Sequence, residues 1–514
     1  MPDIVLIFEV HQPTRFRKDF FWGRRAFARV PKGQLFRHYF DTDADRAIFE
    51  RASRKCYFPT NQILLEVIDQ HKRDRRNVKV AFSLSGVFLE QCEAFNRDVL
   101  DSFRQLADTG CVEFLAQTYF HSLASLYPDR SEFVEQVRLH RQAMKSLLSA
   151  EPRVFENTEL LYNNAIGKAV EALGYSGLCA EGAERVLGGR SPNHLYRPTG
   201  CQRLRLLLRN YRLTDDIGFR FSARWWSEWP LTADKYAGWL AATPGDYVCL
   251  FPDYETFGEH QWPETGIHQF LRHLPEHILR HEHLAFATPS EVVAHHGPVG
   301  EIDVPELGGT SSWADIERCT SSWLGNSLQW AYYARVRDLA PLIREADDTE
   351  FRRLWRHFQI SDHLYYMFAG SGGPGEVHSY FSPYGSPTDA FVAAQAALAD
   401  LEARVRSYAV AANEPFRFHV QEGEGGYTGL EARTLAGFAL ALRRAPMASI
   451  TFHAKRDDFH KWATQSLQDS LLARALKTAT REGRSGGALR KRLTSIVAQR
   501  VEQIRKQLRD LGHL

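Results

Sequence analysis

Two segments of the sequence place a carboxylate directly after a short apolar run, among aromatic rings and amides. The stretch DYETFGEHQW begins at Asp253, after the apolar residues 247–251, and the stretch FENTELLYNN carries Glu159. Such a strand end suits a carbohydrate, because sugars offer hydroxyls to the acids and C–H faces to the aromatic rings. A solvated acidic loop is the alternative for either segment alone. Two such ends, each supplying one acid, favour a carbohydrate site.

The elements that must position these acids follow a repeating pattern from residue 3 to about 290. Short apolar runs alternate with amphipathic segments, which predicts parallel strands joined by crossover helices. Seven or eight such units favour a barrel or near-barrel, whose site lies at the C-terminal ends of its strands. Helices are predicted over Asn61–His71, Glu132–Leu148 and Pro263–Arg280. The predicted strands are Ile4–Val10, Val78–Leu84, Val112–Leu115, Val154–Asn157, Gly177–Cys179, Leu204–Leu208, Tyr247–Phe251 and, with a weaker pattern, Leu284–Ala287.

Polar residues of unusual type fall at the C-terminal ends of these predicted strands. A single histidine at such a place is often a core residue held by backbone hydrogen bonds, so no one position decides the matter. Because the ends of parallel strands meet at one face of a barrel, however, their joint occurrence indicates a site. The residues are His11, Gln12, Gln117, His121, Glu159, Glu181 and Asp253.

Composition narrows the class of partner. The chain has 514 residues, 44% of them hydrophobic and 12% aromatic, which is ample for a large core. Its net charge of +2 gives no overall field for nucleic acid or an anionic membrane, and no apolar stretch is long enough to span a bilayer. We therefore expect neither nucleic acid nor membrane as a partner; a neutral polymer suits this charge balance better.

The cysteines and the first residues bear on cofactors and compartment. Seven cysteines are scattered singly without a CxxC pair, which argues against a zinc site and against a disulfide framework. We expect no metal and no cofactor. The opening MPDIVLIFEV has Asp3 and Glu9 inside its apolar run and no basic leader, which is typical of a first strand and not of a signal peptide. A cytoplasmic location is expected.

The chain divides into three predicted parts: a barrel over residues 1–295, a helical region over 296–411 and a small α+β domain over 412–514. In the second part, helices are predicted over Asn326–Ile343, Thr349–Ser361 and Thr388–Ala411. Between the last two lies the Gly/Pro/Ser-rich loop Ser371–Pro387, which carries Tyr380, Phe381 and Tyr384 and is predicted to cover the site.

The third part mixes both kinds of element. Strands are predicted over Phe416–Val420 and Ala448–His453, and a helix over Leu430–Arg443. A long basic amphipathic helix is predicted over Ala488–Leu511, with an apolar stripe on one face. This helix suggests a docking surface or a homo-oligomer contact, with a simple solvated face as the alternative.

Several motifs in order give the chain a resemblance to glycoside hydrolase family 57, and within it to the α-amylase-like branch. The likeness runs from residue 3 to about 400, and the tail resembles a small domain of unknown function that follows such barrels. The motifs are VHQP (Val10–Pro13), TYFHSLASL (Thr118–Leu126), FENTELLYNN (Phe155–Asn164), RNYRLTDDIGFRFS (Arg209–Ser222), DYETFGEHQW (Asp253–Trp262), SSWADIERCTSSWLGN (Ser311–Asn326) and SDHLYYM (Ser361–Met367).

This resemblance implies an incomplete (β/α)7 barrel followed by a helical region, acting on α-glucans or maltooligosaccharides by a retaining mechanism. It implies that Glu159 is the nucleophile and Asp253 the acid/base. Positions that match sugar-contacting motif positions are His11, His121, Trp313, Asp362 and His363, and we add Gln12, Trp226 and Trp262 as substrate-binding candidates. The chain departs from the family pattern at Gln117, Phe120 and Cys319, where Glu, Tyr and Asp are expected.

Three alternatives stay open beside hydrolysis. The first is a 4-α-glucanotransferase or branching enzyme, in which a sugar hydroxyl replaces water as acceptor. The second is a non-catalytic glycan-binding or regulatory protein, which the presence of both carboxylates disfavours. The third is a metal-dependent polysaccharide deacetylase, which needs a paired-Asp strand end with an HxxxH run. Asp215-Asp216 follows a different strand signature, and His281, His283, His295 and His296 lack that spacing.

Overall fold

The computed structural model describes residues 2–74, 76–314, 316–370, 382–483 and 485–510. Contacts group the chain into two compact units. The barrel unit comprises Met1–Arg15, Thr42–Gln329 and Gln359–Pro387, and the helical unit comprises Phe16–Asp41, Trp330–Phe358 and Thr388–Leu514. This grouping cuts through the predicted helical region, because part of that region packs with the tail. The three-part division into domains stays a prediction.

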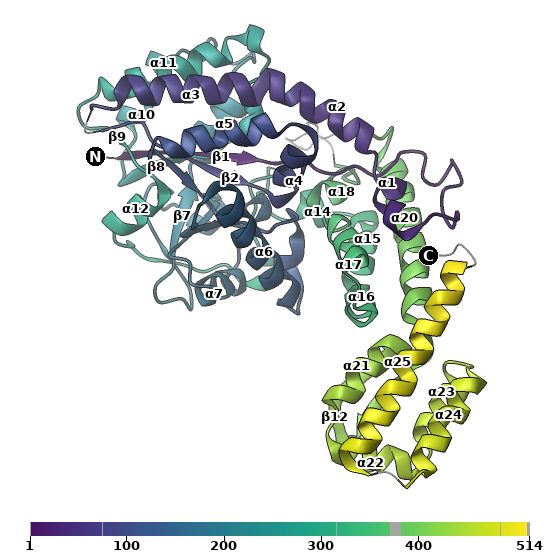
Figure 1. The fold of residues 1–514 in the computed structure, drawn as a ribbon. Coiled ribbons are helices and arrows are strands. Elements are labelled where there is room, and N and C mark those ends of the chain that lie inside the picture. The colour runs from purple at the N-terminus through teal and green to yellow at the C-terminus, as the bar shows by residue number, and fades with distance from the viewer. Residues whose placement is uncertain (1, 75, 315, 371–381, 484, 511–514) are drawn as a thin grey trace. The chain divides into compact units, whose positions relative to one another are not determined.

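All eight predicted strands of the barrel unit form (Figure 1). Seven of them lie in the order β3-β2-β1-β8-β7-β5-β4, all neighbours being parallel, and β9 pairs with β1. The strands are β1 (Asp3–Val10), β2 (Val80–Leu84), β3 (Val112–Phe114), β4 (Val154–Glu156), β5 (Gly177–Glu181), β7 (Arg205–Arg209), β8 (Tyr247–Leu250) and β9 (Ala285–Phe286). The predicted α/β class with an incomplete barrel is confirmed.

The sheet curls until its two edge strands touch. The parallel bridge between Ala116 and Phe155 links the end of β3 to β4, and the amide of Glu156 donates to the carbonyl of Ala116 at 2.7 Å. On the other side, β7 and β8 share one register pair, Arg209 with Cys249. The ring of strands is therefore thinly paired at two places, which is why the barrel is incomplete.

Strand periodicity sorts the apolar residues of β1 onto two faces, since successive side chains point to opposite sides of a sheet. Ile4, Leu6, Phe8 and Val10 belong to the large core between the sheet and the helices around it. Val5 and Ile7 belong instead to the core inside the barrel. The next residue on that inner face is Glu9. The barrel is thus filled by an aliphatic layer and, toward the strands' C-terminal ends, by a polar one.

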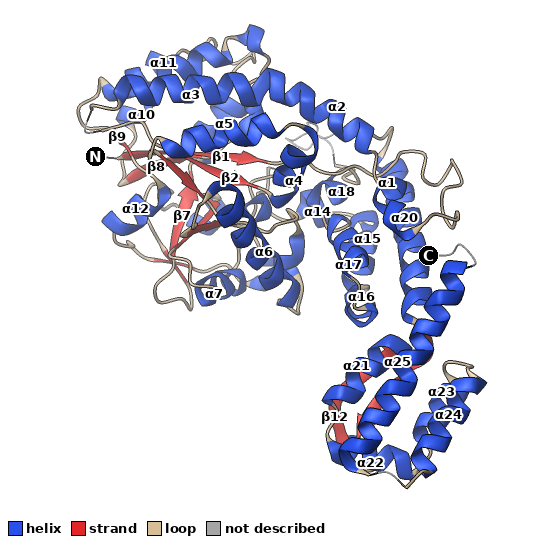
Figure 2. Ribbon diagram, viewed as in Figure 1, coloured by secondary structure: helices blue, strands red, loops and turns tan. Residues whose placement is uncertain are grey.

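Helices surround the strands of the barrel unit (Figure 2). They are α2 (Thr42–Ala52), α3 (Phe58–His71), α4 (Gly86–Phe95), α5 (Arg97–Asp108), α6 (Ser131–Leu148), α7 (Asn164–Ala172), α8 (Glu184–Leu187), α9 (Tyr211–Gly218), α10 (Ala233–Ala242), α11 (Ile267–Leu279), α12 (Pro289–His295), α13 (Glu306–Gly309), α14 (Ser321–Leu324) and α18 (Ser361–Tyr365). The short strands β6 (Arg197–Pro198) and β10 (Glu301–Ile302) pair with each other outside the barrel. Among the described residues, no helix is long and apolar enough to cross a membrane.

The helical unit holds a β-hairpin among helices. Its strands β11 (Ala411–His419) and β12 (Tyr427–Thr434) are antiparallel. The predicted strand Ala448–His453 is wrong, since these residues lie in α22, and the predicted helix Leu430–Arg443 begins instead as strand β12. The helices are α1 (Leu35–Tyr39), α15 (Ser327–Asp338, shared with the barrel unit), α16 (Ala340–Ala346), α17 (Thr349–His357), α20 (Pro387–Ala409), α21 (Leu435–Arg444), α22 (Met447–Lys455), α23 (Asp458–Gln465), α24 (Ser470–Arg481) and α25 (Gly486–Asp510).

The loop predicted to cover the site falls largely outside the described residues. Tyr380 and Phe381 belong to that undescribed part. Tyr384 is described, and its ring centroid lies 5.8 Å from that of Tyr366, just after α18.

Candidate active site

The Glu159 carboxylate is held by side chains that come from distant parts of the sequence. The Trp313 indole Nε1 donates to Glu159 Oε2 at 2.8 Å, and the Ser361 hydroxyl donates to Oε1 at 2.8 Å. The His121 Nε2 atom lies 3.4 Å from the same Oε1. Glu159 itself has a left-handed backbone, with φ of 61°. Such a conformation costs a non-glycine residue on the order of 1–2 kcal/mol, and strain of this kind gathers at functional residues.

The hydrogen bonds of His121 fix its protonation state. The Gln117 amide nitrogen donates to Glu9 Oε1 at 3.0 Å and to Ser83 Oγ at 2.8 Å, so the Gln117 oxygen faces His121 Nδ1 at 3.0 Å. An amide oxygen only accepts, so Nδ1 of His121 carries a proton. The raised pKa of His121 means that Nε2 carries one as well, so the ring is an imidazolium.

Electrostatics supports the same assignment for His121. Burial alone would lower the pKa of His121, but the hydrogen bond and charge of Glu159, with the nearby Glu9 and Glu156, raise it to about 10. The backbone of His121 is also left-handed, with φ of 46°.

His11 has the opposite character from its neighbour. Its ring stacks on that of His121 at 4.0 Å between centroids. Burial and the charge of His121 lower the pKa of His11 to about 4, so the ring is neutral. Its Nε2 donates to Asp362 Oδ2 at 3.0 Å, and its Nδ1 accepts from the Ser85 hydroxyl at 2.7 Å. The contact with His11 holds the pKa of Asp362 below its usual range against the effect of burial.

Asp253 follows β8 and continues its pairing with β1. A parallel bridge joins Asp253 to Glu9, and the Glu9 amide donates to the Pro252 carbonyl at 3.2 Å. Burial, followed by the charge of Glu159, raises the pKa of Asp253 to about 7, while Arg209 opposes the shift. The influence of Glu159 on this pKa shows that the two carboxyls share one electrostatic environment. Asp253 is the member of the pair suited to carry a proton near neutral pH.

A second layer of acids lies beneath the pair, and the sequence analysis assigned no role to it. Ser83 donates to Glu156 Oε2 at 3.1 Å, and Gln117 bridges Ser83 to Glu9. Burial and mutual repulsion raise the pKa of Glu9, and burial raises that of Glu156 to about 7. Both glutamates sit on the inner face of a strand, two residues after a core aliphatic residue. Strand periodicity applied to β1 and β4 is the signal that finds them.

A buried ion network ties the Trp313 loop to the barrel. Arg209, the last residue of β7, bonds Glu181 at 2.9 Å and Asp215 at 2.8 Å. Arg318 reaches the same two acids at 3.2 and 2.7 Å and donates to the Trp313 carbonyl at 2.6 Å. The sequence predicted Glu181 at a strand end but gave no role to either arginine.

The remaining substrate-binding candidates are only partly brought together. Gln12 is buried and donates to Glu255 at 3.4 Å, and His363 is buried on α18 beside Asp362. Trp226 packs against the large core and Trp239, with centroids 6.0 Å apart. Trp262 is half exposed, with the Lys55 amine 4.9 Å from its ring centre. The described contacts do not join either tryptophan to the group around Glu159.

The two other departures from the expected pattern lie apart from the carboxylate pair. Phe120 is buried in a small cluster with Val87 and Ile360. Cys319 is half-buried, with its Sγ 3.3 Å from the Ser321 hydroxyl. All seven cysteines are free thiols. In the part of the chain that the structure describes, no group of three or more His, Cys, Asp or Glu is arranged to hold a metal ion.

The protein has an incomplete β/α barrel with two carboxyl groups at the C-terminal ends of its strands. One has a pKa near neutral, and the other is held by hydrogen-bond donors. These features define a glycoside hydrolase. The chain belongs to glycosyl hydrolase family 57, whose profile matches residues 5–305. It is 45% identical over 408 residues to the "Putative alpha-amylase" of Methanocaldococcus jannaschii, covering 78% of this chain and 84% of that protein. An alpha-amylase of Pyrococcus furiosus is 26% identical over 151 residues, 29% of this chain and 22% of that protein.

Solved structures share the fold at low identity. The 4-alpha-glucanotransferase of Thermococcus litoralis matches with a TM-score of 0.54 at 17% identity, over 81% of this chain and 61% of that one. A GH57 branching enzyme of Thermococcus kodakaraensis matches with a TM-score of 0.54 at 13% identity, over 79% of this chain and 89% of that one. These likenesses establish the fold alone.

Proposed function

We propose that this glycoside hydrolase cleaves α-1,4-glucosidic bonds in α-glucans or maltooligosaccharides with retention of configuration. Glu159 acts as the nucleophile and Asp253 as the acid/base. The observation that carries the proposal is the contrast between the two carboxyls. The Glu159 carboxylate accepts hydrogen bonds from Trp313 and Ser361 beside an imidazolium, whereas burial and Glu159 raise the pKa of Asp253 to about 7.

The reaction then proceeds in two halves. Asp253 donates its proton to the leaving glycosidic oxygen while Glu159 Oε attacks the anomeric carbon, which forms a glycosyl ester and breaks the C–O bond to the leaving sugar. Asp253, now a carboxylate, removes a proton from water or from another sugar hydroxyl, and that oxygen displaces Glu159. Direct attack requires the carboxyls to lie about 5–5.5 Å apart when substrate is bound.

We further propose that transfer accompanies hydrolysis. The relatives named as alpha-amylases and the structural neighbour named as a glucanotransferase are compatible with either acceptor. Exposed aromatic rings of the barrel unit, at Trp225 and Trp262, offer stacking surfaces for a sugar acceptor.

The deciding experiment incubates the purified protein with amylose, glycogen and single maltooligosaccharides, then resolves the products by size, linkage and initial anomer. Shorter products released as the α-anomer support retaining hydrolysis. Products longer than the substrate support transfer, and new α-1,6 linkages identify a branching enzyme. Binding without any product identifies the non-catalytic alternative and overturns the proposal.

The proposal also covers the location and the assembly of the protein. We propose a cytoplasmic location, supported by seven free thiols, and a homo-oligomer through the basic helix α25. Subcellular fractionation tests the first. Light scattering of the protein before and after replacing exposed basic residues of α25 tests the second.

A further inference from the structure

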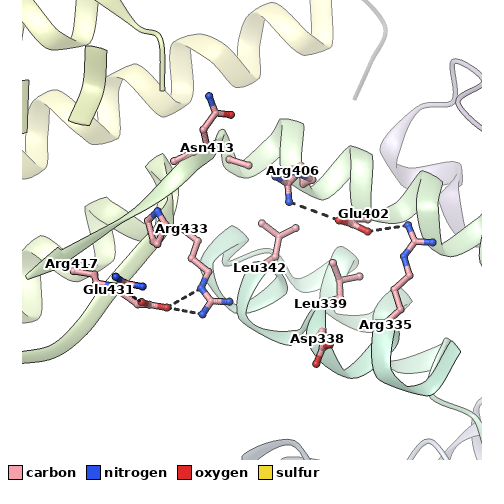
Figure 3. A pocket seen from close by; sticks show the side chains of 13 residues that line it. Arg335, Asp338, Leu339, Leu342, Glu402, Arg406, Asn413, Arg417, Glu431 and Arg433 are labelled. Atoms are coloured by element: carbon pink, nitrogen blue, oxygen red, sulfur yellow. Dashed lines mark hydrogen bonds and ion pairs between the residues drawn. The ribbon is translucent and has the colours of Figure 1, made fainter. Parts of the chain in front are cut away.

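A groove of about 410 Å³ lies within the helical unit, and none of its lining residues is named in the barrel site. Helices α15, α16 and α20 and the hairpin strands β11 and β12 contribute its walls (Figure 3). Its volume falls within the range typical of small-molecule sites. Nothing in the proposed glycosidase reaction uses it.

Four arginines line this groove, and two of them are already hydrogen-bonded to glutamates. Arg335 donates to Glu402 at 3.0 Å, and Arg433 donates to Glu431 at 2.9 Å. Figure 3 shows these two pairs on opposite sides of Leu342. Each glutamate is therefore neutralised by one partner and fixes that partner's position.

The other two arginines form only longer ion pairs with the same two glutamates. Arg406 lies 3.8 Å from Glu402, and Arg417 lies 3.6 Å from Glu431, both longer than a hydrogen bond. Their side chains are 53% and 63% exposed. Because a guanidinium presents five N–H donors in a planar fork, each can engage a phosphoryl or carboxylate group bidentately.

The charge balance of the lining is positive. Four guanidiniums face Glu402 and Glu431, and the third acid, Asp338, bonds Arg337, which does not line the groove. An incoming anion therefore meets one uncompensated guanidinium near each glutamate. Coulombic attraction is weak near water and falls with distance, so a ligand gains most when the spacing of its anionic groups matches that of the guanidiniums.

The floor of the groove is apolar. Leu339 and Leu342 are buried there, beside Ala411, Ala412 and Pro415. None of the described lining residues is aromatic. Sugars are commonly held by stacking on aromatic rings, so this lining fits a neutral glycan poorly. It fits a ligand with anionic groups and a compact organic body.

We propose that the groove binds a small organic diphosphate. Its phosphoryl groups are held by Arg406 and Arg417, with Arg335 and Arg433 behind them, and its organic body rests on the leucine floor. Its lining shares no residue with the group around the carboxylate pair.

Isothermal titration calorimetry on the full chain tests this site, with ADP as the probe, pyrophosphate as the bare anion and adenosine as the uncharged match. ADP and pyrophosphate should bind and compete, and adenosine should not. In the double variant Arg406→Gln, Arg417→Gln, the ADP affinity should fall about a hundredfold, since each charged hydrogen-bonding group removed costs about tenfold. Exposed ion pairs contribute little to stability, so this variant should fold.

The matched control is Arg443→Gln, Arg444→Gln, which removes the same charge from exposed positions on α21 outside the groove. It should bind ADP as the parent chain does. The proposal is overturned by the absence of ADP and pyrophosphate binding at millimolar concentration, by equal losses in both double variants, or by adenosine binding as tightly as ADP. If circular dichroism shows the double variant unfolded, the single variants carry the same comparison.

Discussion

The side chain of His121 shows how a single protonation state is built into a site. It donates from one nitrogen to Gln117 and from the other toward Glu159, and it stacks on the neutral ring of His11. Acids also face it from the strands beneath, at Glu9 and Glu156. His121 therefore places a positive charge beside the Glu159 carboxyl, the proposed nucleophile.

Replacing Gln117 by Leu should remove the acceptor of His121 Nδ1 and lower kcat/KM about 10–100-fold, because a hydrogen bond to a charged group is lost. Gln117→Glu restores an acceptor and should recover most of the activity. Steady-state kinetics measures kcat/KM of both variants, and ¹⁵N NMR of the histidine ring reports its protonation state. A neutral His121 ring at about pH 7 in the parent protein would contradict this assignment.

The activity should fall as the pH rises through the pKa of Asp253. A proton donor is competent only while protonated, and the pKa of Asp253 is about 7. The profile of kcat/KM against pH should therefore have an alkaline limb near that value. Asp253→Asn should abolish turnover of unactivated glucans. Activity that stays constant to about pH 9 would assign the proton donor elsewhere.

The same shift has a consequence for stability with a definite sign. The pKa of Asp253 rises from 3.8 to about 7 on folding, so the native state binds the proton more tightly and loses stability as the pH rises between these values. Asp253→Asn should therefore increase the free energy of unfolding by about 2–4 kcal/mol above pH 7. The gain should shrink on acidification and vanish near the lower value. Urea unfolding at a series of pH values measures it.

Glu159→Gln should abolish turnover while glucan binding persists, because the amide keeps the shape of the side chain but cannot attack carbon. Calorimetry with a maltooligosaccharide reports binding, and reducing-sugar release reports turnover. Substantial residual hydrolysis in this variant would show that another group is the nucleophile.

Two arginines hold the loop that carries Trp313 in place. Arg185 donates to the carbonyls of Gly309, Thr310, Glu317 and Arg318, and Arg318 reaches inward to the acids of the barrel. The guanidinium of Arg318 also lies 4.1 Å from the centre of the Tyr211 ring. The indole that bonds Glu159 is therefore fixed from both sides of its loop.

Arg318→Gln should loosen this loop and leave Glu181 and Asp215 sharing one cation. Breaking a buried ion pair costs about 3–5 kcal/mol, so the free energy of unfolding should fall by about that amount and kcat should drop with it. Arg212→Gln, which removes an exposed partner of Glu184, is the matched control and should change stability by less than about 1 kcal/mol. Equal effects of the two substitutions would mean that the network does not hold the loop.

Elements were predictable from the sequence where one physical signal dominated. Apolar runs bounded by turns located the barrel strands, and Glu159, Asp253 and His121 all follow the ends of those strands. The segment Ala448–His453 failed because a short apolar run does not distinguish a strand from a buried helix. The structure packs Trp226 against the large core, and its role in substrate binding stays a prediction, because a tryptophan packs in a core as readily as it stacks on a sugar.

For the molecule as a whole, we expect the chemistry and the C-terminal residues to be separable. Among the described residues, the side chains that contact Glu159 come from His121, Trp313 and Ser361, whereas α16 packs with β12 and α21 of the tail. A chain ending at residue 411 should keep kcat within about twofold but melt at a lower temperature, because the apolar face of α16 loses its cover. Kinetics and circular dichroism test this. Loss of turnover in a folded truncated protein would show that the tail completes the site.

The positions of the Glu159 partners in the sequence determine when, during translation, the active site can be completed. The glutamate is synthesised early, but its donors Trp313 and Ser361 leave the ribosome more than 150 residues later, and both lie beyond the segment 5–305 that matches the family. A nascent chain that ends just after the last barrel strand contains both proposed catalytic carboxyls. It still lacks Trp313 and Ser361, which position the carboxylate of Glu159. Glucan-cleaving ability should therefore appear on translating ribosomes only once the SDHLYYM segment has emerged.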